Sequence, residues 1–148
     1  MNTEVANAPV RKHMSVEHTI DHDARLIITV WKGAASGQSL SNALRNYQQT
    51  IKVSPECQHY NELVDFSLIG GVDLSARDMM SLGRVAQQSD QSDVRTRLAL
   101  LVASPLVFGL AKMYVAYRSL VPGSHKDLAV FRSRTEALAW LSADQEDS

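Results

Sequence analysis

The chain has 148 residues, enough for one domain with a buried core, and its 45% apolar and 21% charged residues are typical of a globular protein. A net charge of −1 argues against a nucleic-acid-binding surface, and the single cysteine, Cys57, excludes an internal disulfide. No stretch approaches the roughly 20 apolar residues that span a bilayer, and the N-terminus lacks a signal peptide's apolar core, so we expect a cytoplasmic protein.

The first third of the chain predicts an arm, a hairpin and a helix. Residues 1–13 are expected to form a flexible N-terminal arm. Residues 14–20 alternate weakly between apolar and polar side chains, and residues 25–31 are rich in β-branched side chains. With a turn between them, they predict an antiparallel hairpin whose more polar first strand lies at an edge. Residues 36–53 predict a helix, because apolar side chains recur there at helical spacing.

The middle of the chain predicts a strand followed by a helix. Residues 62–69 predict a strand that we expect Gly70-Gly71 to end. Ser75, with Asp78 three residues later, predicts a capping box at the start of the next helix. The buried stripe of this helix is expected to consist of Met79, Leu82, Gly83 and Ala86.

The last third contains the clearest unit. Residues 98–103 are continuously apolar, which favours a strand buried on both faces. Ser104 and Pro105 then suit the cap and the first position of a helix that ends near Pro122-Gly123. A strand at 128–131, a helix at 135–141 and an acidic tail at 143–148 follow. The predicted order ββαβαβαβα indicates a single α/β domain over residues 14–142, with a mixed, mostly parallel sheet covered by about four helices.

Charge is unevenly distributed around the helix of residues 106–121. Residues 95–134 carry seven basic side chains and one acidic side chain, a net charge of +6. We expect one broad face of this helix to cover the sheet; it comprises Leu106, Val107, Leu110, Met113, Tyr114, Tyr117, Leu120 and Val121. The other side carries Phe108 and Val115 beside Lys112 and Arg118. Either neighbouring loops cover Phe108, or these four residues form a surface for a membrane or a protein partner.

Four stretches carry a resemblance to a known family. They are Leu63-Val64-Asp65-Phe66, Ala99 to Pro105, Phe108 to Tyr114, and Val130-Phe131 together with Glu136 to Leu141. With the predicted element order, they resemble the SpoIIAA-like family of bacterial domains related to STAS and CRAL-TRIO proteins. The resemblance implies a STAS-like fold and a non-enzymatic domain, with apolar-ligand binding and membrane association proposed for such folds.

The resemblance also draws attention to Ser75. STAS anti-sigma antagonists carry an Asp-Ser-Ser-Gly stretch, with a phosphorylated serine, at the start of the helix after the middle strand. The matching stretch here is Asp73-Leu74-Ser75-Ala76, in which Leu74 and Ala76 depart from the pattern. Ser75 is therefore either a helix cap or a phosphorylation site that switches a protein interaction.

No residue pattern indicates catalysis, a cofactor or a metal. His18 and His22 are four residues apart beside Asp21 and Asp23, but this spacing at the end of a strand does not bring the ligands together. Nothing near Cys57 predicts an activated thiolate. We therefore expect a binding module that holds a small apolar or lipid-like ligand between sheet and helices and associates weakly with membranes. The residues expected to line the ligand site are Met79, Met80, Met113, Tyr114 and Tyr117. The alternative is a regulatory interaction domain switched at Ser75.

Overall fold

A computed structural model describes residues 14–88, 94–121 and 125–143. The predictions for the arm at 1–13, most of the loop at 87–93, the turn at Pro122-Gly123 and the tail at 144–148 lie outside the described residues. None of the helices in the described part of the chain has the length and apolar content needed to span a bilayer.

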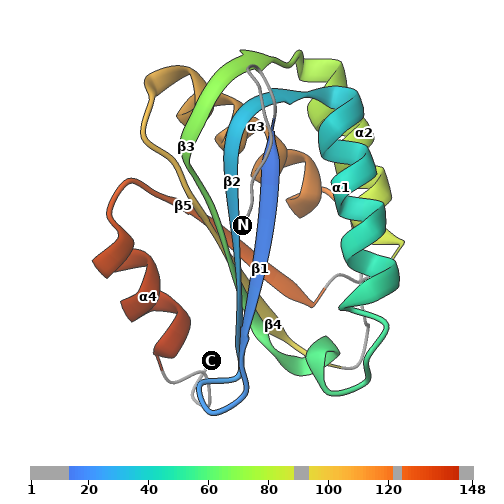
Figure 1. Ribbon diagram of the computed structural model, residues 1–148, viewed down its shortest axis with the longest axis vertical. Coiled ribbons are helices and arrows are strands. Elements are labelled where there is room, and N and C mark those ends of the chain that lie inside the picture. Colours follow the sequence, from blue (N-terminus) through green and yellow to red (C-terminus); the bar gives the residue numbers. More distant parts are fainter. Residues whose placement is uncertain (1–13, 89–93, 122–124, 144–148) are drawn as a thin grey trace, which may run out of the picture.

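The described residues form the predicted order of strands and helices (Figure 1). The elements are β1 (Ser15–Asp21), β2 (Leu26–Ser36), α1 (Gly37–Thr50), a 3-10 helix η1 (Cys57–His59), β3 (Asn61–Asp73), α2 (Ala76–Gln87), β4 (Thr96–Leu101), α3 (Pro105–Ser119), β5 (Lys126–Phe131) and α4 (Arg134–Ser142).

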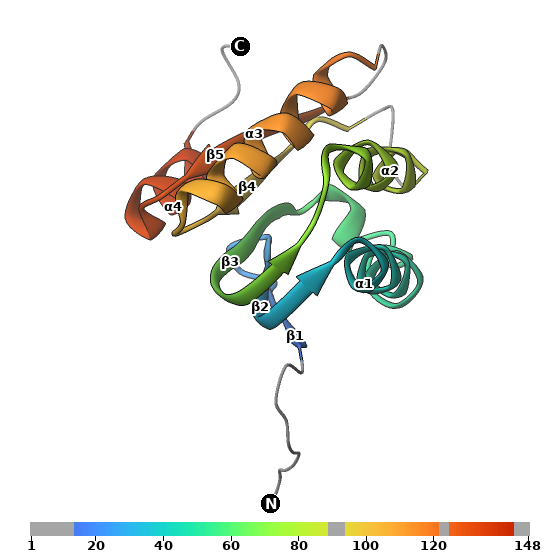
Figure 2. The same ribbon diagram turned by 90° about the horizontal axis from the view of Figure 1, so that it is seen from above.

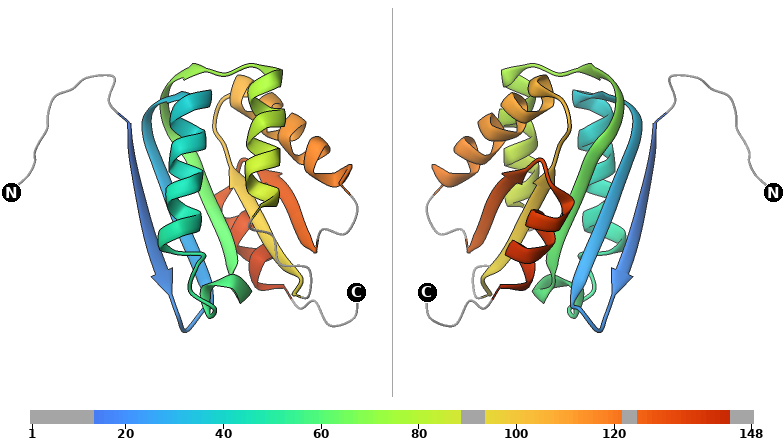
Figure 3. Two further views of the ribbon diagram at one scale, coloured as in Figure 1. Left: turned by 90° about the vertical axis from the view of Figure 1, so that its right-hand side faces the viewer. Right: turned by 90° about the vertical axis from the view of Figure 1, so that its left-hand side faces the viewer.

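The strands form one sheet in sequential order, β1-β2-β3-β4-β5. β1 pairs antiparallel with β2, and the other neighbours pair parallel, which confirms the predicted mixed sheet. Because α1, α2 and α3 each connect neighbouring parallel strands through right-handed crossovers, all three cover the same face. Figure 2 shows α1 and α2 side by side. α4 follows the last strand and covers the opposite face, as the two views of Figure 3 show.

Both faces of the sheet contribute to the core. On the α4 side, Leu63, Ala99 and Leu101 pack against Ala137 and Leu141. On the other side, two adjoining clusters join the sheet to α1, α2 and α3; their buried members are Trp31, Ala35, Leu40, Met79, Leu82, Leu98, Leu100, Val102, Val107, Leu110 and Ala111. Five of the six residues of β4 are buried, so the prediction of a strand enclosed on both faces is confirmed.

The predicted end of β3 at Gly70-Gly71 is wrong. β3 continues to Asp73, because β2 also runs past Gly33 to Ser36 and keeps pairing with it. Two register shifts accommodate this extension, and Gly33 lies beside one of them with a φ of 88°, which a glycine adopts without strain. The glycines therefore lie within the strand pairing and do not terminate it.

The face with which α3 packs differs from the predicted one. Its buried residues are Val107, Leu110, Ala111 and Arg118, whereas Leu106 is 59% exposed and Leu120 is 77% exposed. The placement of Leu106 and Leu120 in the core was therefore wrong. Apolar side chains occur on all sides of this helix, so periodicity alone does not determine which side is buried.

Candidate functional site: a cavity between the sheet and three helices

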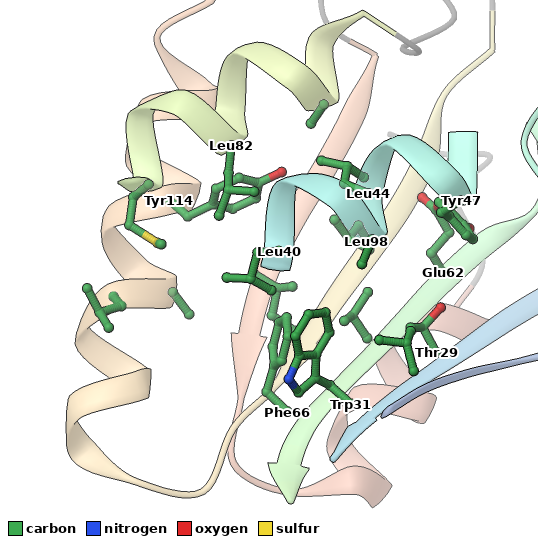
Figure 4. A pocket seen from close by; sticks show the side chains of 18 of the residues that line it. Thr29, Trp31, Leu40, Leu44, Tyr47, Glu62, Phe66, Leu82, Leu98 and Tyr114 are labelled. Atoms are coloured by element: carbon green, nitrogen blue, oxygen red, sulfur yellow. The ribbon is translucent and has the colours of Figure 1, made fainter. Parts of the chain in front are cut away.

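A cavity of about 180 Å³ lies between the sheet and helices α1, α2 and α3. Most of its lining is apolar, and Figure 4 shows the arrangement of its side chains. The apolar lining residues are Val16, Trp31, Leu40, Ala43, Leu44, Val64, Phe66, Ile69, Leu74, Met79, Leu82, Ala86, Leu98, Leu100, Val107, Leu110 and Ala111, with Tyr114 beside them.

Strand alternation determines which sheet residues line the cavity. Successive side chains of a strand point to opposite faces. The register pairs Thr29 with Val64 and Val64 with Leu100, so these three and the residues two positions away along each strand lie on the same face. That face is the one covered by α1, α2 and α3. Trp31 and Phe66 meet there with their ring centroids 6.1 Å apart.

A buried ionic cluster centred on Glu62 forms one part of the wall. The Tyr47 hydroxyl donates to Glu62 Oε2 over 2.7 Å. Lys126 Nζ donates to Glu62 Oε1, and Lys52 Nζ lies 3.8 Å from Oε2. Lys52 also donates to the carbonyl oxygen of Cys57 over 3.0 Å. The cluster therefore joins β3, β5 and the segment after α1.

The charge states of this cluster follow from its surroundings. Burial opposes ionisation of Glu62, but the ammonium groups of Lys126 and Lys52 outweigh it and lower the pKa of the carboxyl group to about 2. Burial, together with the negative charge of Glu62, raises the pKa of the Tyr47 hydroxyl far above its ordinary value. At neutral pH, Glu62 is therefore ionised and Tyr47 is a protonated hydrogen-bond donor.

His18 from β1 adds a polar group to the same wall. Its Nδ1 atom lies 2.7 Å from Thr29 Oγ1, and its ring centroid is 5.0 Å from that of Tyr47. Burial lowers the pKa of the imidazole. His18 is therefore a neutral group at pH 7 and adds hydrogen-bonding capacity without charge.

Arg118 occupies the wall formed by α3 and corrects one prediction. Sequence analysis placed it beside Phe108 on the outer side of the helix, but Arg118 is 3% exposed and lines the cavity. Its guanidinium donates to the Tyr114 hydroxyl over 2.9 Å and lies 5.8 Å from the centroid of the Tyr114 ring. The i, i+4 spacing of the two residues on one helix explains the contact.

Two of the five residues predicted to contact a ligand line the cavity, and three do not. Met79 and Tyr114 line the cavity. Tyr117 packs against the same hydrophobic cluster without lining the cavity. Met80 and Met113 are 39% and 36% exposed and lie outside the lining.

Of the other three residues of the predicted outer surface of α3, only Lys112 is exposed, so the prediction of an open apolar surface at Phe108 and Val115 is wrong. Lys112 is exposed, whereas Phe108 and Val115 are half-buried against the cluster of Leu98, Leu100 and Val102. The Arg132 guanidinium lies 4.2 Å above the centroid of the Phe108 ring. A contact of this surface with a membrane stays a prediction.

Ser75 has the predicted helix-capping role. Its hydroxyl accepts a hydrogen bond from the Asp78 N–H over 3.2 Å, and Asp78 Oδ2 accepts one from the Ser75 N–H over 2.9 Å. The capping box at the start of α2 is therefore confirmed. The side chain is exposed, and phosphorylation of Ser75 stays a prediction.

The histidines near the first turn make other contacts. His22 Nδ1 lies 2.8 Å from the Tyr60 hydroxyl, while His18 contacts Thr29. Within residues 14–88, 94–121 and 125–143, no group of three or more histidine, cysteine or acidic side chains is placed to hold a metal ion.

Sequence reasoning missed the Glu62 cluster. The available signal was an acidic residue at the start of a predicted strand of the sheet, because a buried carboxylate in such a place requires a cationic partner. Its partners are 10 and 64 residues away in the chain, at Lys52 and Lys126. Sequence spacing alone does not identify them.

Comparison with known proteins supports the fold. No protein-family model and no curated protein matches the sequence. The structure is similar to the crystal structure of an uncharacterized protein of the DUF3478 family, with a SpoIIAA-like fold, from Shewanella loihica PV-4. The match has 17% sequence identity and a TM-score of 0.50, and it covers 91% of this chain and 98% of that chain. The protein therefore has the SpoIIAA-like fold that its sequence resemblance implied.

Proposed function

We propose that this protein is a non-enzymatic binding module that holds a small, largely apolar molecule between the sheet and helices α1, α2 and α3. The observation that carries the proposal is the cavity of about 180 Å³ with its predominantly apolar lining. A concave apolar space with a few polar groups in its wall is the usual form of a small-molecule site.

The cavity volume limits the size of this molecule. An engineered cavity of about 150 Å³ binds benzene, whereas drug-sized ligands occupy roughly 300–1,000 Å³. A volume of about 180 Å³ therefore suits one aromatic ring with a small substituent, or a short branched chain. We favour such a molecule over a long lipid chain.

The protonation behaviour of the polar wall supports a binding role over an enzymatic one. General acids and bases work best when their pKa lies near the operating pH. The pKa of Glu62 is lowered to about 2, and that of Tyr47 is raised well above its ordinary value. Neither group is suited to exchange protons at neutral pH, although both can orient a bound molecule.

A titration with toluene, followed by NMR of the full chain, tests this function. We expect saturable shifts of methyl signals from lining residues such as Leu40 and Leu82. Ala43→Phe adds a ring-sized group from α1 into the cavity and should abolish the shifts. Ala116→Phe, at an exposed position of α3 outside the lining, is the matched control and should still bind. Equal binding by the two variants would contradict the proposal.

A regulatory domain switched at Ser75 is the second candidate. The exposed hydroxyl at the start of the 12-residue helix α2 favours it, because the helix dipole attracts negative charge there. The Asp78 carboxylate beside Ser75 disfavours it, because a phosphate would meet a like charge. Stable phosphate on Ser75 in protein from the native cell would promote this candidate.

A further inference from the structure

We infer that the molecule held in the cavity carries an uncharged hydroxyl group, as a small phenol or aromatic alcohol does, and that His18 binds this hydroxyl. The inference rests on the proposed function, because it assigns a polar group and an orientation to the same ligand. It deepens that proposal from a small apolar molecule to a defined chemical class.

The first argument is the place of His18 in the wall. Side chains of β1 alternate between exposed and half-buried, and His18 belongs to the half-buried set. Its ring lies against the Tyr47 ring of α1, with the two centroids 5.0 Å apart. Both residues line the cavity. A bound molecule would therefore meet the His18 imidazole as part of the wall.

The second argument is that the protein engages only one of the two ring nitrogens of His18. Nδ1 lies 2.7 Å from Oγ1 of Thr29, its partner in the pairing of β1 with β2. Among the described residues, the other nitrogen, Nε2, has no hydrogen-bond partner. Nε2 is also not one of the fully buried polar atoms that lack a partner, so it is accessible. A ligand can therefore hydrogen-bond to Nε2 without displacing a protein contact.

The third argument is the charge state of this corner of the cavity. Burial lowers the pKa of the His18 imidazole, so the ring is neutral at pH 7. A neutral partner does not offset the cost of moving a carboxylate or an ammonium group out of water. A carboxylate would also approach the ionised Glu62, because the Tyr47 ring that His18 contacts carries the hydroxyl bonded to Glu62. An uncharged polar group on the ligand avoids these costs.

The fourth argument identifies the uncharged group as a hydroxyl. The Thr29 hydroxyl can donate to Nδ1 of His18 or accept from it, so the hydrogen bond between them is compatible with both neutral tautomers. Nε2 is an acceptor in one tautomer and a donor in the other. A ligand hydroxyl matches both, because it has a donor and two acceptor lone pairs, whereas a carbonyl group matches only one.

The wall next to His18 suits the apolar body of such a molecule. Val16 and Trp31 pair with each other two positions along β1 and β2 from the pair of His18 and Thr29. They therefore lie on the same face of the sheet, roughly 7 Å further along it, which one aromatic ring can span. Figure 4 shows Thr29 and Trp31 on the side of the sheet toward Leu40 of α1. A ring bound through His18 would extend into this apolar part of the cavity.

Three single-ring probes test the inference with the full chain at pH 7: toluene, phenol and benzoate. We expect phenol to bind at least as tightly as toluene, and benzoate to bind most weakly. His18→Leu should lower the ratio of phenol affinity to toluene affinity by about fivefold or more, because the hydroxyl then lacks its partner. His18→Gln, whose amide can reach the place of Nε2, should keep part of the preference. His22→Leu is the matched control and should leave the ratio unchanged, because His22 contacts Tyr60 outside the lining.

Nitrogen NMR of the His18 imidazole gives a second measurement on the wild-type protein. Phenol should shift the Nε2 signal of His18, because it forms a hydrogen bond there, and toluene should shift it less. This measurement holds even where His18→Leu does not fold. An Nε2 signal that phenol and toluene shift equally would refute the assignment of His18.

The outcomes separate the inference from the proposed function. If toluene binds and His18→Leu has the same affinity ratio as wild type, the contact with His18 is refuted and the apolar binding function stands. If benzoate binds more tightly than phenol, the uncharged hydroxyl is refuted and the binding function again stands. If neither toluene nor phenol binds, the proposed function fails and the inference fails with it.

Discussion

Replacing Glu62 by glutamine should destabilise the protein by about 3 kcal/mol. The substitution keeps the shape of the side chain but leaves the ammonium groups of Lys52 and Lys126 buried without their carboxylate. Breaking a buried ion pair by removing one partner costs about 3–5 kcal/mol. The pKa gives a similar figure, because a fall from 4.5 to about 2 corresponds to roughly 3 kcal/mol at 1.36 kcal/mol per unit.

The same pKa shift defines a pH window. Because the folded pKa of Glu62 is lowered, the unfolded chain binds the proton more readily, and this group stabilises the folded state above about pH 4.5. The contribution is lost as pH falls from 4.5 towards 2. The difference in unfolding free energy between wild type and Glu62→Gln should therefore shrink to roughly half by pH 3.

Urea denaturation followed by circular dichroism at pH 7, 4.5 and 3 measures both effects. Glu17→Gln, on the exposed side of β1, is the matched control and should change stability by less than about 0.5 kcal/mol. A loss below about 1 kcal/mol for Glu62→Gln at pH 7 would refute the reasoning about the buried cluster. So would a difference from wild type that stays constant from pH 7 to pH 3.

Three further predictions concern other parts of the fold. Leu101→Ala should cost roughly 2–5 kcal/mol in denaturant melts, because Leu101 is buried between β4 and α4, and a loss below about 1 kcal/mol would contradict its place in the core. Ser75→Ala should cost about 1 kcal/mol in the same assay while Ser75→Asp is tolerated, because aspartate also caps helices, and equal losses would contradict the cap. If the outer side of α3 contacts membranes, wild type should co-float with anionic vesicles at low salt and a folded Phe108→Asp variant should not; equal flotation would reject the membrane contact.

Local signals in the sequence predicted the elements well. Ser75 and Ser104 both cap helices as predicted, because a hydroxyl at the first turn satisfies a backbone N–H regardless of the rest of the fold. The continuous apolar run at residues 98–103 also predicted a strand buried on both faces, which β4 is. The alternation of these elements was enough to predict a mostly parallel sheet.

Features that depend on long-range packing were predicted less well. α3 is apolar on all sides, so its periodicity could not show that Arg118 points inward and Leu106 outward. The extension of β3 past Gly70-Gly71 depends on its partner β2, which local composition does not report. The candidate site was predicted as a space between sheet and helices, and of the five residues predicted to line it only Met79 and Tyr114 do so. Its ionic wall was missed, because it is assembled from distant parts of the chain.

Native mass spectrometry of the full chain purified from its own cells tests the central claim most directly. The account predicts an added mass of one small molecule that disappears on denaturation, is recovered by solvent extraction and is absent from Ala43→Phe. Wild-type protein whose native mass equals that of the polypeptide, with an empty extract, would contradict the claim that the cavity is a ligand-binding site. An added mass that persists unchanged in Ala43→Phe would contradict it as well.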